Sequence, residues 1–260
     1  MEKITSRSNE KIKYASALLS ASKRRECGEF LLEGARLCSD AAQSGVEIVR
    51  AFFTADALSR YGEYISVISA VCIECCEIDS GISGRLSDTE NTQGVFCVCK
   101  MRDASAVPLK KGGRYLMLEN VQDPSNTGAI FRTCEALGID ALILSGGCDI
   151  YNPKALRAAM GSSLRMDVIF AADPVSYIES NSGSAVFLAC VPSADARDIT
   201  QALKDCGESA TVCVLGNEGA GLTDEVISAC GERVTIPMKG RAESLNVSVA
   251  AAIAAWESVK

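Results

Sequence analysis

The sequence predicts an α/β protein with a parallel sheet in its C-terminal part and a smaller α/β domain before it. From residue 114 onward, short and continuously apolar segments alternate with helical ones. Such strands are typical of a parallel sheet covered by helices on both faces. The chain has 260 residues, 48% of them hydrophobic, which suits two modest domains with real cores.

A segment rich in charge, proline and glycine divides the chain. The stretch MRDASAVPLKKGG occupies residues 101–113 and has the composition of a linker. We therefore assign residues 1–100 to the first domain, 101–113 to the linker and 114–260 to the second domain.

The first domain shows helical, extended and loop patterns in turn. Apolar residues at roughly helical spacing predict a helix over residues 4–22, and FLLEG followed by ARLCSDAAQSG predicts a strand and then a helix. Residues 80–92 are polar and contain glycines, so we expect a loop there. Further strands are expected at 48–54, 72–78 and 94–99.

The second domain alternates strands and helices throughout. Strands are predicted at 115–119, 141–144, 168–170, 185–190, 211–215 and 233–236, and helices at 127–137, 153–160, 174–180, 199–204, 223–229 and 245–257. Ligands of open parallel sheets bind beyond the carboxyl ends of the strands. The segments 120–126, 216–221 and 237–244 all begin at such ends, so we expect them to converge on one site.

Composition excludes several kinds of chemistry. The chain has no histidine, which rules out Ser-His-Asp and Cys-His nucleophiles and histidine-ligated metals. Its 13 cysteines are scattered through apolar runs, so we expect buried free thiols and no metal. The alternative is a zinc site built from Cys72, Cys75 and Cys76 with Cys97 and Cys99, but the second pair is C-x-C and is explained more simply by strand residues.

Charge and hydropathy bear on partners and location. The net charge of −7 is unfavourable for nucleic acid, although cations outnumber acids within residues 1–36. That basic segment fits either an RNA contact or the solvated face of an amphipathic helix. No apolar stretch is long enough for a bilayer, and no apolar region follows the N-terminal charges. We therefore expect a cytoplasmic protein with no membrane association.

Three motifs have both a structural and a functional interpretation. In DPSNTGAIFRTCEALG, Asn126 is a plausible N-cap whose helix start attracts anions near Arg132, although an ordinary capped helix explains the same pattern. LGNEGAGL fits a ligand-binding loop or a tight turn, and it matches neither the dinucleotide fingerprint nor a Walker loop. In ESLNVSVA, a serine or glutamate is expected to cap the last helix. Ser244 and Asn246 at its start are either caps or groups that hold a ribose or a cofactor carboxylate.

Together and in this order, these three motifs resemble those of the SpoU/TrmH family of RNA 2′-O-ribose methyltransferases, in the SPOUT superfamily. The resemblance implies a SPOUT domain with a deep trefoil knot that binds S-adenosylmethionine. It also implies a homodimer. FLLEGARLC and LSDTENTQGVFCVCK resemble the substrate-binding domain of many members, which recognises RNA.

The resemblance also assigns the site residues. Arg132 matches the family's catalytic arginine, and Asn126 and Glu218 match its other catalytic positions. The cofactor would be bound by Leu188, Ala189, Leu215, Gly216, Asn217, Ile236, Ser244, Leu245 and Asn246.

The implied reaction is in-line methyl transfer to a ribose 2′-hydroxyl. Because a guanidinium group stays protonated in proteins, we expect Arg132 to bind phosphate and stabilise the developing alkoxide. Phosphate, Glu218 or water would then take the proton. We expect ribosomal RNA as the substrate. The alternatives are the same reaction on tRNA, and a non-catalytic RNA-binding assembly factor.

Overall fold

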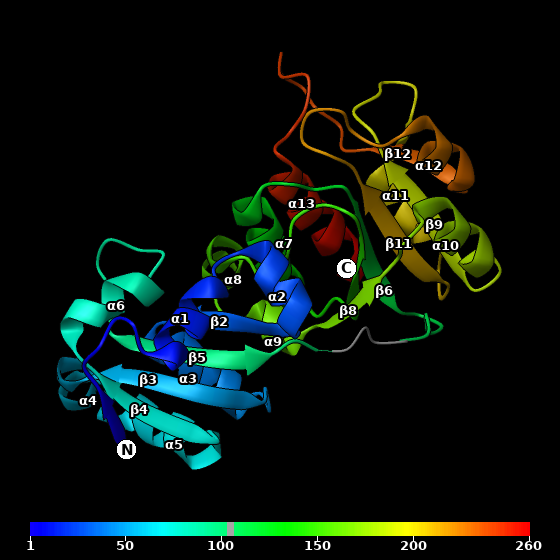
Figure 1. The fold of residues 1–260 in the computed structure, drawn as a ribbon. Coiled ribbons are helices and arrows are strands. Elements are labelled where there is room, and N and C mark those ends of the chain that lie inside the picture. The colour runs from blue at the N-terminus through cyan, green and yellow to red at the C-terminus, as the bar shows by residue number, and fades with distance from the viewer. Residues whose placement is uncertain (103–106) are drawn as a thin grey trace. The chain divides into compact units, whose positions relative to one another are not determined.

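The computed structural model describes residues 1–102 and 107–260, which divide into two compact units (Figure 1). The first unit comprises Met1–Arg102 with Asp149–Leu164, and the second comprises Asp103–Cys148 with Arg165–Lys260. The segment Asp149–Leu164 thus belongs to the first unit, although in sequence it lies between two strands of the second unit's sheet. Part of the predicted linker, residues 103–106, lies outside the described residues.

The first unit contains a five-stranded mixed sheet in the order β1-β4-β3-β5-β2. Strands β1, β4 and β3 are parallel, whereas β5 runs antiparallel to β3 and β2. The strands are β1 (Glu2–Ile4), β2 (Glu29–Glu33), β3 (Ile48–Thr54), β4 (Glu74–Ile78) and β5 (Val95–Lys100). The helices are α1 (Glu10–Ala17), α2 (Ala21–Cys27), α3 (Ala35–Gln43), α4 (Ala55–Arg60), α5 (Gly62–Val71) and α6 (Ser80–Leu86).

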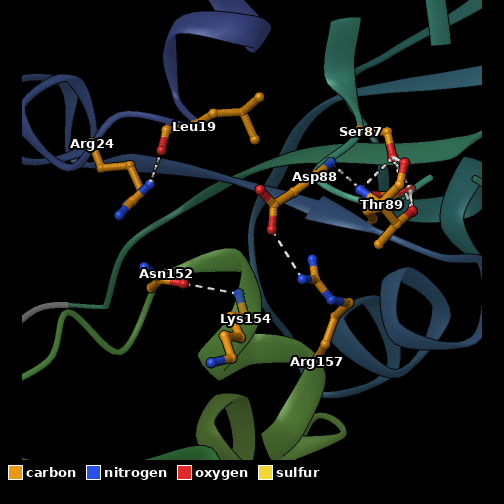
Figure 2. Close-up of polar contacts among 9 residues, drawn as sticks. Leu19, Arg24, Ser87, Asp88, Thr89, Asn152, Lys154 and Arg157 are labelled. Carbon is orange, nitrogen blue, oxygen red and sulfur yellow. Dashed lines mark hydrogen bonds and ion pairs between the residues drawn. The ribbon is translucent and has the colours of Figure 1, made fainter. Parts of the chain in front are cut away.

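The later segment of the first unit carries α8 (Pro153–Ala159) and the start of α9 (Ser162–Arg165). Leu156 of α8 is buried in the same apolar cluster as Phe30 of β2. At the start of the segment, Asp149 accepts hydrogen bonds from Arg24 of α2, at 2.9 Å from Nε and 2.6 Å from Nη2. Arg24 also donates to the backbone carbonyl of Leu19 (Figure 2). The segment is therefore tied to the first unit by apolar packing and by a buried ion pair.

Two predictions for the first unit are wrong. Residues 4–22 do not form one helix, because Ile4 lies in β1 and a break after Ala17 separates α1 from α2. The expected loop 80–92 begins with α6, in which Ile82 and Leu86 are buried one turn apart. Glycines at positions 81 and 84 lower the intrinsic helix propensity of this stretch, and burial of its apolar face compensates.

The second unit is a seven-stranded sheet, parallel throughout, in the order β10-β12-β9-β11-β6-β7-β8. The strands are β6 (Arg114–Glu119), β7 (Ala141–Ser145), β8 (Asp167–Phe170), β9 (Ala185–Cys190), β10 (Arg197–Asp198), β11 (Ala210–Leu215) and β12 (Glu232–Thr235). The helices are α7 (Pro124–Leu137), α10 (Pro174–Asn181), α11 (Ile199–Asp205), α12 (Asp224–Ala229) and α13 (Val247–Val259).

Helices cover both faces of this parallel sheet. Tyr115 and Met117 of β6 share a core with Ile178 of α10 and Val226 of α12. The alternate residue Leu116 is also fully buried, on the face where α13 packs against β6, β11 and α7 (Figure 1). The predicted fold class, a parallel α/β domain after a smaller α/β domain, is confirmed. The trefoil knot stays a prediction.

None of the described helices is long and apolar enough to cross a bilayer.

Candidate active site

The carboxylate of Glu218, in the loop after β11, binds the start of α7. It accepts hydrogen bonds from the backbone N–H groups of Gln122 at 3.1 Å and Asp123 at 3.0 Å, and from Nδ2 of Asn126 at 3.0 Å. Nδ2 of Asn246 in turn donates to Oδ1 of Asn126 at 3.1 Å. The three segments that follow β6, β11 and β12 therefore converge on one site, as predicted.

These contacts set the charge state of Glu218. Partial burial raises the pKa of its carboxyl group, but the hydrogen bonds from Asn126, Asp123 and Gln122 outweigh burial and lower the pKa below its usual value. The carboxylate is thus held ionised. Its oxygens are already engaged by donors within the protein, so the geometry suits positioning better than proton transfer.

The loop after β11 is closed by its own backbone. Asn217 and Gly221 exchange N–H···O bonds of 3.0 and 2.9 Å, and Asn217 Oδ1 accepts from the N–H groups of Gly219 and Ala220. A Cβ atom at Gly216 would lie 2.2 Å from the carbonyl carbon of Gly221. Glycine is therefore required at position 216, because the backbone at the two ends of the loop is in contact there.

A buried carboxylate holds the far end of this loop. Glu119, the last residue of β6, is 6% exposed. It accepts from Thr223 Oγ1 at 2.7 Å and from the Thr223 N–H at 3.0 Å. Thr223 is also the N-cap of α12, so β6 fixes where the loop ends and the helix begins.

A cavity of about 580 Å³ opens between these loops. The sequence-predicted residues that line it are Leu215, Gly216, Asn217, Glu218, Ile236, Ser244 and Leu245. Its walls combine apolar side chains with backbone of the glycine-rich loop. A volume of this size accommodates a typical small-molecule cofactor.

The other predicted site residues lie elsewhere in the second unit. Leu188 and Ala189 are fully buried within β9, and the cavity wall starts at the next residue, Cys190. Asn246 contacts Asn126 and does not line the cavity. Arg132 is exposed on α7 and forms no hydrogen bond or ion pair with any residue that the structure describes.

Several lining residues were not predicted from the sequence. Cys190, Val191 and Pro192 follow β9, and Met238 follows β12. The position of the first three directly after a strand of the parallel sheet is the signal that identifies them.

The structure corrects the cap of α7 and identifies the cap of α13. Asp123, not Asn126, caps α7, and its carboxylate accepts from the N–H groups of Ser125 and Asn126 at 2.7 and 3.1 Å. Of the capping residues expected for the last helix, Asn246 caps α13 and accepts from the Ser248 N–H at 2.8 Å, whereas Ser244 and the glutamate do not cap it. Asn126 therefore lies inside the first turn of α7, where its side chain is available to Glu218 and Asn246.

The cysteines considered for zinc do not gather into one ligand set. Within the described residues, the one cluster with metal-ligand spacing is Glu2, Glu74 and Cys76. Lys11 already forms ion pairs with both of those carboxylates and Arg50 pairs with Glu74, so two cations balance the two negative charges.

Comparison with known proteins agrees with this geometry. Residues 113–256 match the SpoU rRNA Methylase family, and residues 9–97 match the MRM3-like substrate binding domain. The chain is 30% identical to the 23S rRNA (guanosine(2553)-2′-O)-methyltransferase of Bacillus subtilis, over 97% of each protein. It is 27% identical to a 23S rRNA (uridine(2479)-2′-O)-methyltransferase of Streptomyces viridochromogenes, covering 99% of this chain and 92% of that one.

A solved structure extends the similarity to three dimensions. The AdoMet-bound rRNA methyltransferase from Sinorhizobium meliloti superposes with a TM-score of 0.84 at 26% identity, covering 99% of this chain and 97% of that one. Both units are therefore included in the match. The chain belongs to the SpoU rRNA methylase family.

Proposed function

We propose that this protein transfers a methyl group from S-adenosylmethionine to a ribose 2′-hydroxyl of RNA, with ribosomal RNA as its substrate. The observation that carries the proposal is the cavity beside the Glu218–Asn126–Asn246 network, where the three family motifs meet. The named relatives support it, since they act on 23S rRNA.

The cavity fits the cofactor in size and in chemistry. Its volume of about 580 Å³ suits a nucleoside-sized ligand, and the loop from Gly216 to Gly221 offers backbone groups without side chains in the way. When bound, S-adenosylmethionine supplies a methyl group on a sulfonium centre. Within our proposal, the residues that hold it are Leu215, Gly216, Asn217, Ile236, Ser244 and Leu245.

The remaining site residues orient the RNA and handle charge. Arg132 has no protein partner in the described part of the chain, so its guanidinium group is available for an RNA phosphate and for charge developing on the 2′-oxygen. Asn126 is fixed between Glu218 and Asn246. We assign Glu218 to positioning, which leaves water or the substrate phosphate to accept the proton.

The proposal includes assembly and location. Val249 and Trp256 of α13 are 47% and 52% exposed and lie two turns apart on one face of the helix. This apolar stripe supports a homodimer formed through α13. We retain the knotted topology and the cytoplasmic location as part of the same proposal.

Labelled methyl transfer tests this function. We expect the protein to transfer radiolabelled methyl from S-adenosylmethionine to unmodified ribosomal RNA, and nuclease mapping to find the label on a ribose. Arg132→Ala should lower kcat by at least about 100-fold, because a donor aimed at developing charge is lost. Lys204→Ala removes an exposed cation on α11 and is the matched control.

Equal labelling by Arg132→Ala would contradict the role of Arg132. Absence of labelling by the wild type, on ribosomal RNA and tRNA alike, would favour a non-catalytic assembly factor. Labelling of tRNA alone would move the substrate assignment to tRNA.

A further inference from the structure

The first unit contains a second cavity, of about 190 Å³, separate from the candidate active site. Its walls come from the turn between β2 and α3, from the loop before β5 and from α8. All of its lining residues belong to the first unit.

Arg157 of α8 brings an unsatisfied donor to this cavity. Its Nη2 donates to Asp88 Oδ2 at 2.9 Å, the contact drawn in Figure 2. Its Nη1 is buried and has no hydrogen-bond partner within the described residues. A buried N–H group without an acceptor is costly. Because Nη1 is closed to solvent, an acceptor in the cavity reaches it only after the Arg157 side chain rotates.

Arg36 and Asp40 add a donor and an acceptor from α3. They lie one helical turn apart and both line the cavity. Neither side chain forms an ion pair with another residue in the described ranges, 1–102 and 107–260. The cavity thus presents free hydrogen-bonding groups of both kinds.

The polar walls are held in place by the surrounding chain. Glu33 accepts hydrogen bonds from Ser87 Oγ at 2.7 Å and Thr89 Oγ1 at 3.0 Å. Gln93 Oε1 accepts from the Ala35 N–H at 2.8 Å. These contacts fix the rim before any ligand arrives, which lowers the entropic cost of binding.

The remaining walls are apolar. Leu37 lies on α3, and Met160 ends α8 in the left-handed region with φ 49°. Met160 is 46% exposed, so its flexible thioether is available to a flat ring. A cavity with an apolar wall, two guanidinium groups and the two carboxylates of Glu33 and Asp40 suits a planar heterocycle better than a simple anion.

We propose that this cavity binds an unpaired nucleobase of the RNA substrate. The inference rests on the proposed RNA methyltransferase function and extends it by assigning a recognition site for single-stranded RNA. Ring carbonyl and ring nitrogen atoms would accept from Arg157 and Arg36, and a base N–H group would donate to Asp40. A phosphate has no donor for Asp40 and would be repelled by its carboxylate.

Fluorescence anisotropy with RNA tests the proposal directly. The probes are a single-stranded RNA of about 12 nucleotides and the duplex with its complement. Arg36→Ala should raise the Kd for the single strand about five- to tenfold and leave the duplex affinity unchanged. Arg60→Ala removes an exposed arginine of the same unit outside the cavity and should change the Kd less than twofold.

Asp40→Ala separates a base from a phosphate. Loss of an acceptor for a base N–H should weaken binding of the single strand, whereas loss of a negative charge beside a phosphate should strengthen it. Weaker binding supports the proposal. Stronger or unchanged binding overturns it, as does unchanged binding by Arg36→Ala.

This experiment does not depend on catalysis. If the wild type transfers no methyl group but Arg36→Ala and Asp40→Ala still weaken single-strand binding, the proposed reaction fails and the base site stands. If methyl transfer occurs and both variants bind RNA like the wild type, the proposed reaction stands and the base site fails. Circular dichroism of each variant confirms that the fold is retained.

Discussion

At the scale of single residues, buried charges in this protein are satisfied by specific partners. Arg24 is the clearest case, because its side chain is 2% exposed and bonds to the carbonyls of Leu18 and Leu19 as well as to Asp149. Asp149 lies 125 positions away in sequence. One carboxylate therefore anchors a distant segment of chain to the first unit and compensates a guanidinium group removed from water.

Replacing Asp149 with alanine should strongly destabilise the first unit. The substitution leaves the Arg24 guanidinium buried with only neutral acceptors, which costs about 3–5 kcal/mol. Urea unfolding followed by circular dichroism would measure the loss as a lower midpoint. Arg24→Met is the matched variant and should cost less, because the charge that it leaves unpaired is the Asp149 carboxylate, which is 24% exposed, whereas the Arg24 side chain is 2% exposed. If Arg24→Met proved the more damaging of the two, the ion-pair explanation would be wrong.

At the scale of elements, the candidate site is made by loops that follow parallel strands. The loop from Gly216 to Gly221 is closed on itself, tied to β6 through Glu119 and Thr223, and tied to α7 through Glu218. Asn217 Nδ2 also donates to the Asn120 carbonyl at 2.9 Å. The cavity wall is therefore rigid because each of its ends is bonded to a different element.

Gly216→Ala should abolish cofactor binding. The new Cβ atom would lie 2.2 Å from the Gly221 carbonyl carbon and 2.3 Å from the Leu222 nitrogen, so backbone would have to move. Gly183→Ala is the control, since a Cβ there meets nothing within 4 Å and Gly183 does not line the cavity. Calorimetric titration with S-adenosylmethionine should show no binding by the first variant and near-normal binding by the second. Equal affinities would exclude a tight loop as part of the binding site.

The sequence predicts such elements well where local pattern and tertiary burial agree. The strands at Ile48–Thr54 and Ala185–Cys190 have the predicted bounds, because their apolar runs are bordered by polar or turn residues. Convergence of the motif loops also followed from the strand-end rule. The N-cap of α7 is harder to predict from sequence, because Asp123 and Asn126 are both good capping residues. The choice between them depends on which backbone N–H groups each side chain reaches in the folded protein.

The second cavity lies beyond what the sequence indicates. It joins α3 to α8, and no local pattern relates Arg36 to Arg157. The three family motifs do not include α8 either. This helix follows β7 of the second unit's sheet in sequence but belongs to the first unit. A site made from elements this far apart in sequence is visible only in the folded chain.

At the scale of the whole molecule, α13 presents two different faces. Ala251, Ala254 and Ala255 are buried, which allows the helix to lie close to its neighbours. Val249 and Trp256 are exposed on the other side, an unusual position for large apolar groups on a helix rich in alanine. An apolar stripe of this kind is expected to be covered by a second protein surface.

We expect Trp256→Glu to convert the proposed homodimer into a monomer. A carboxylate in the centre of an apolar interface would be desolvated without a partner, at a cost that exceeds the contribution of most single interface residues. Sedimentation velocity would measure the change in mass. Phe170→Glu is the control, because Phe170 is 49% exposed on β8, away from α13.

Trp256 also reports on its own burial, because it is the single tryptophan of the chain. In the dimer its indole would be shielded from water, so its emission should move to longer wavelength when the wild type is diluted through the dissociation range. The midpoint of that shift should match the midpoint of the mass change. A wild type that sediments as a monomer, with emission independent of concentration, would show that α13 is not covered by a second copy. Trp256 would then be free to contact another partner, with RNA as the first to test.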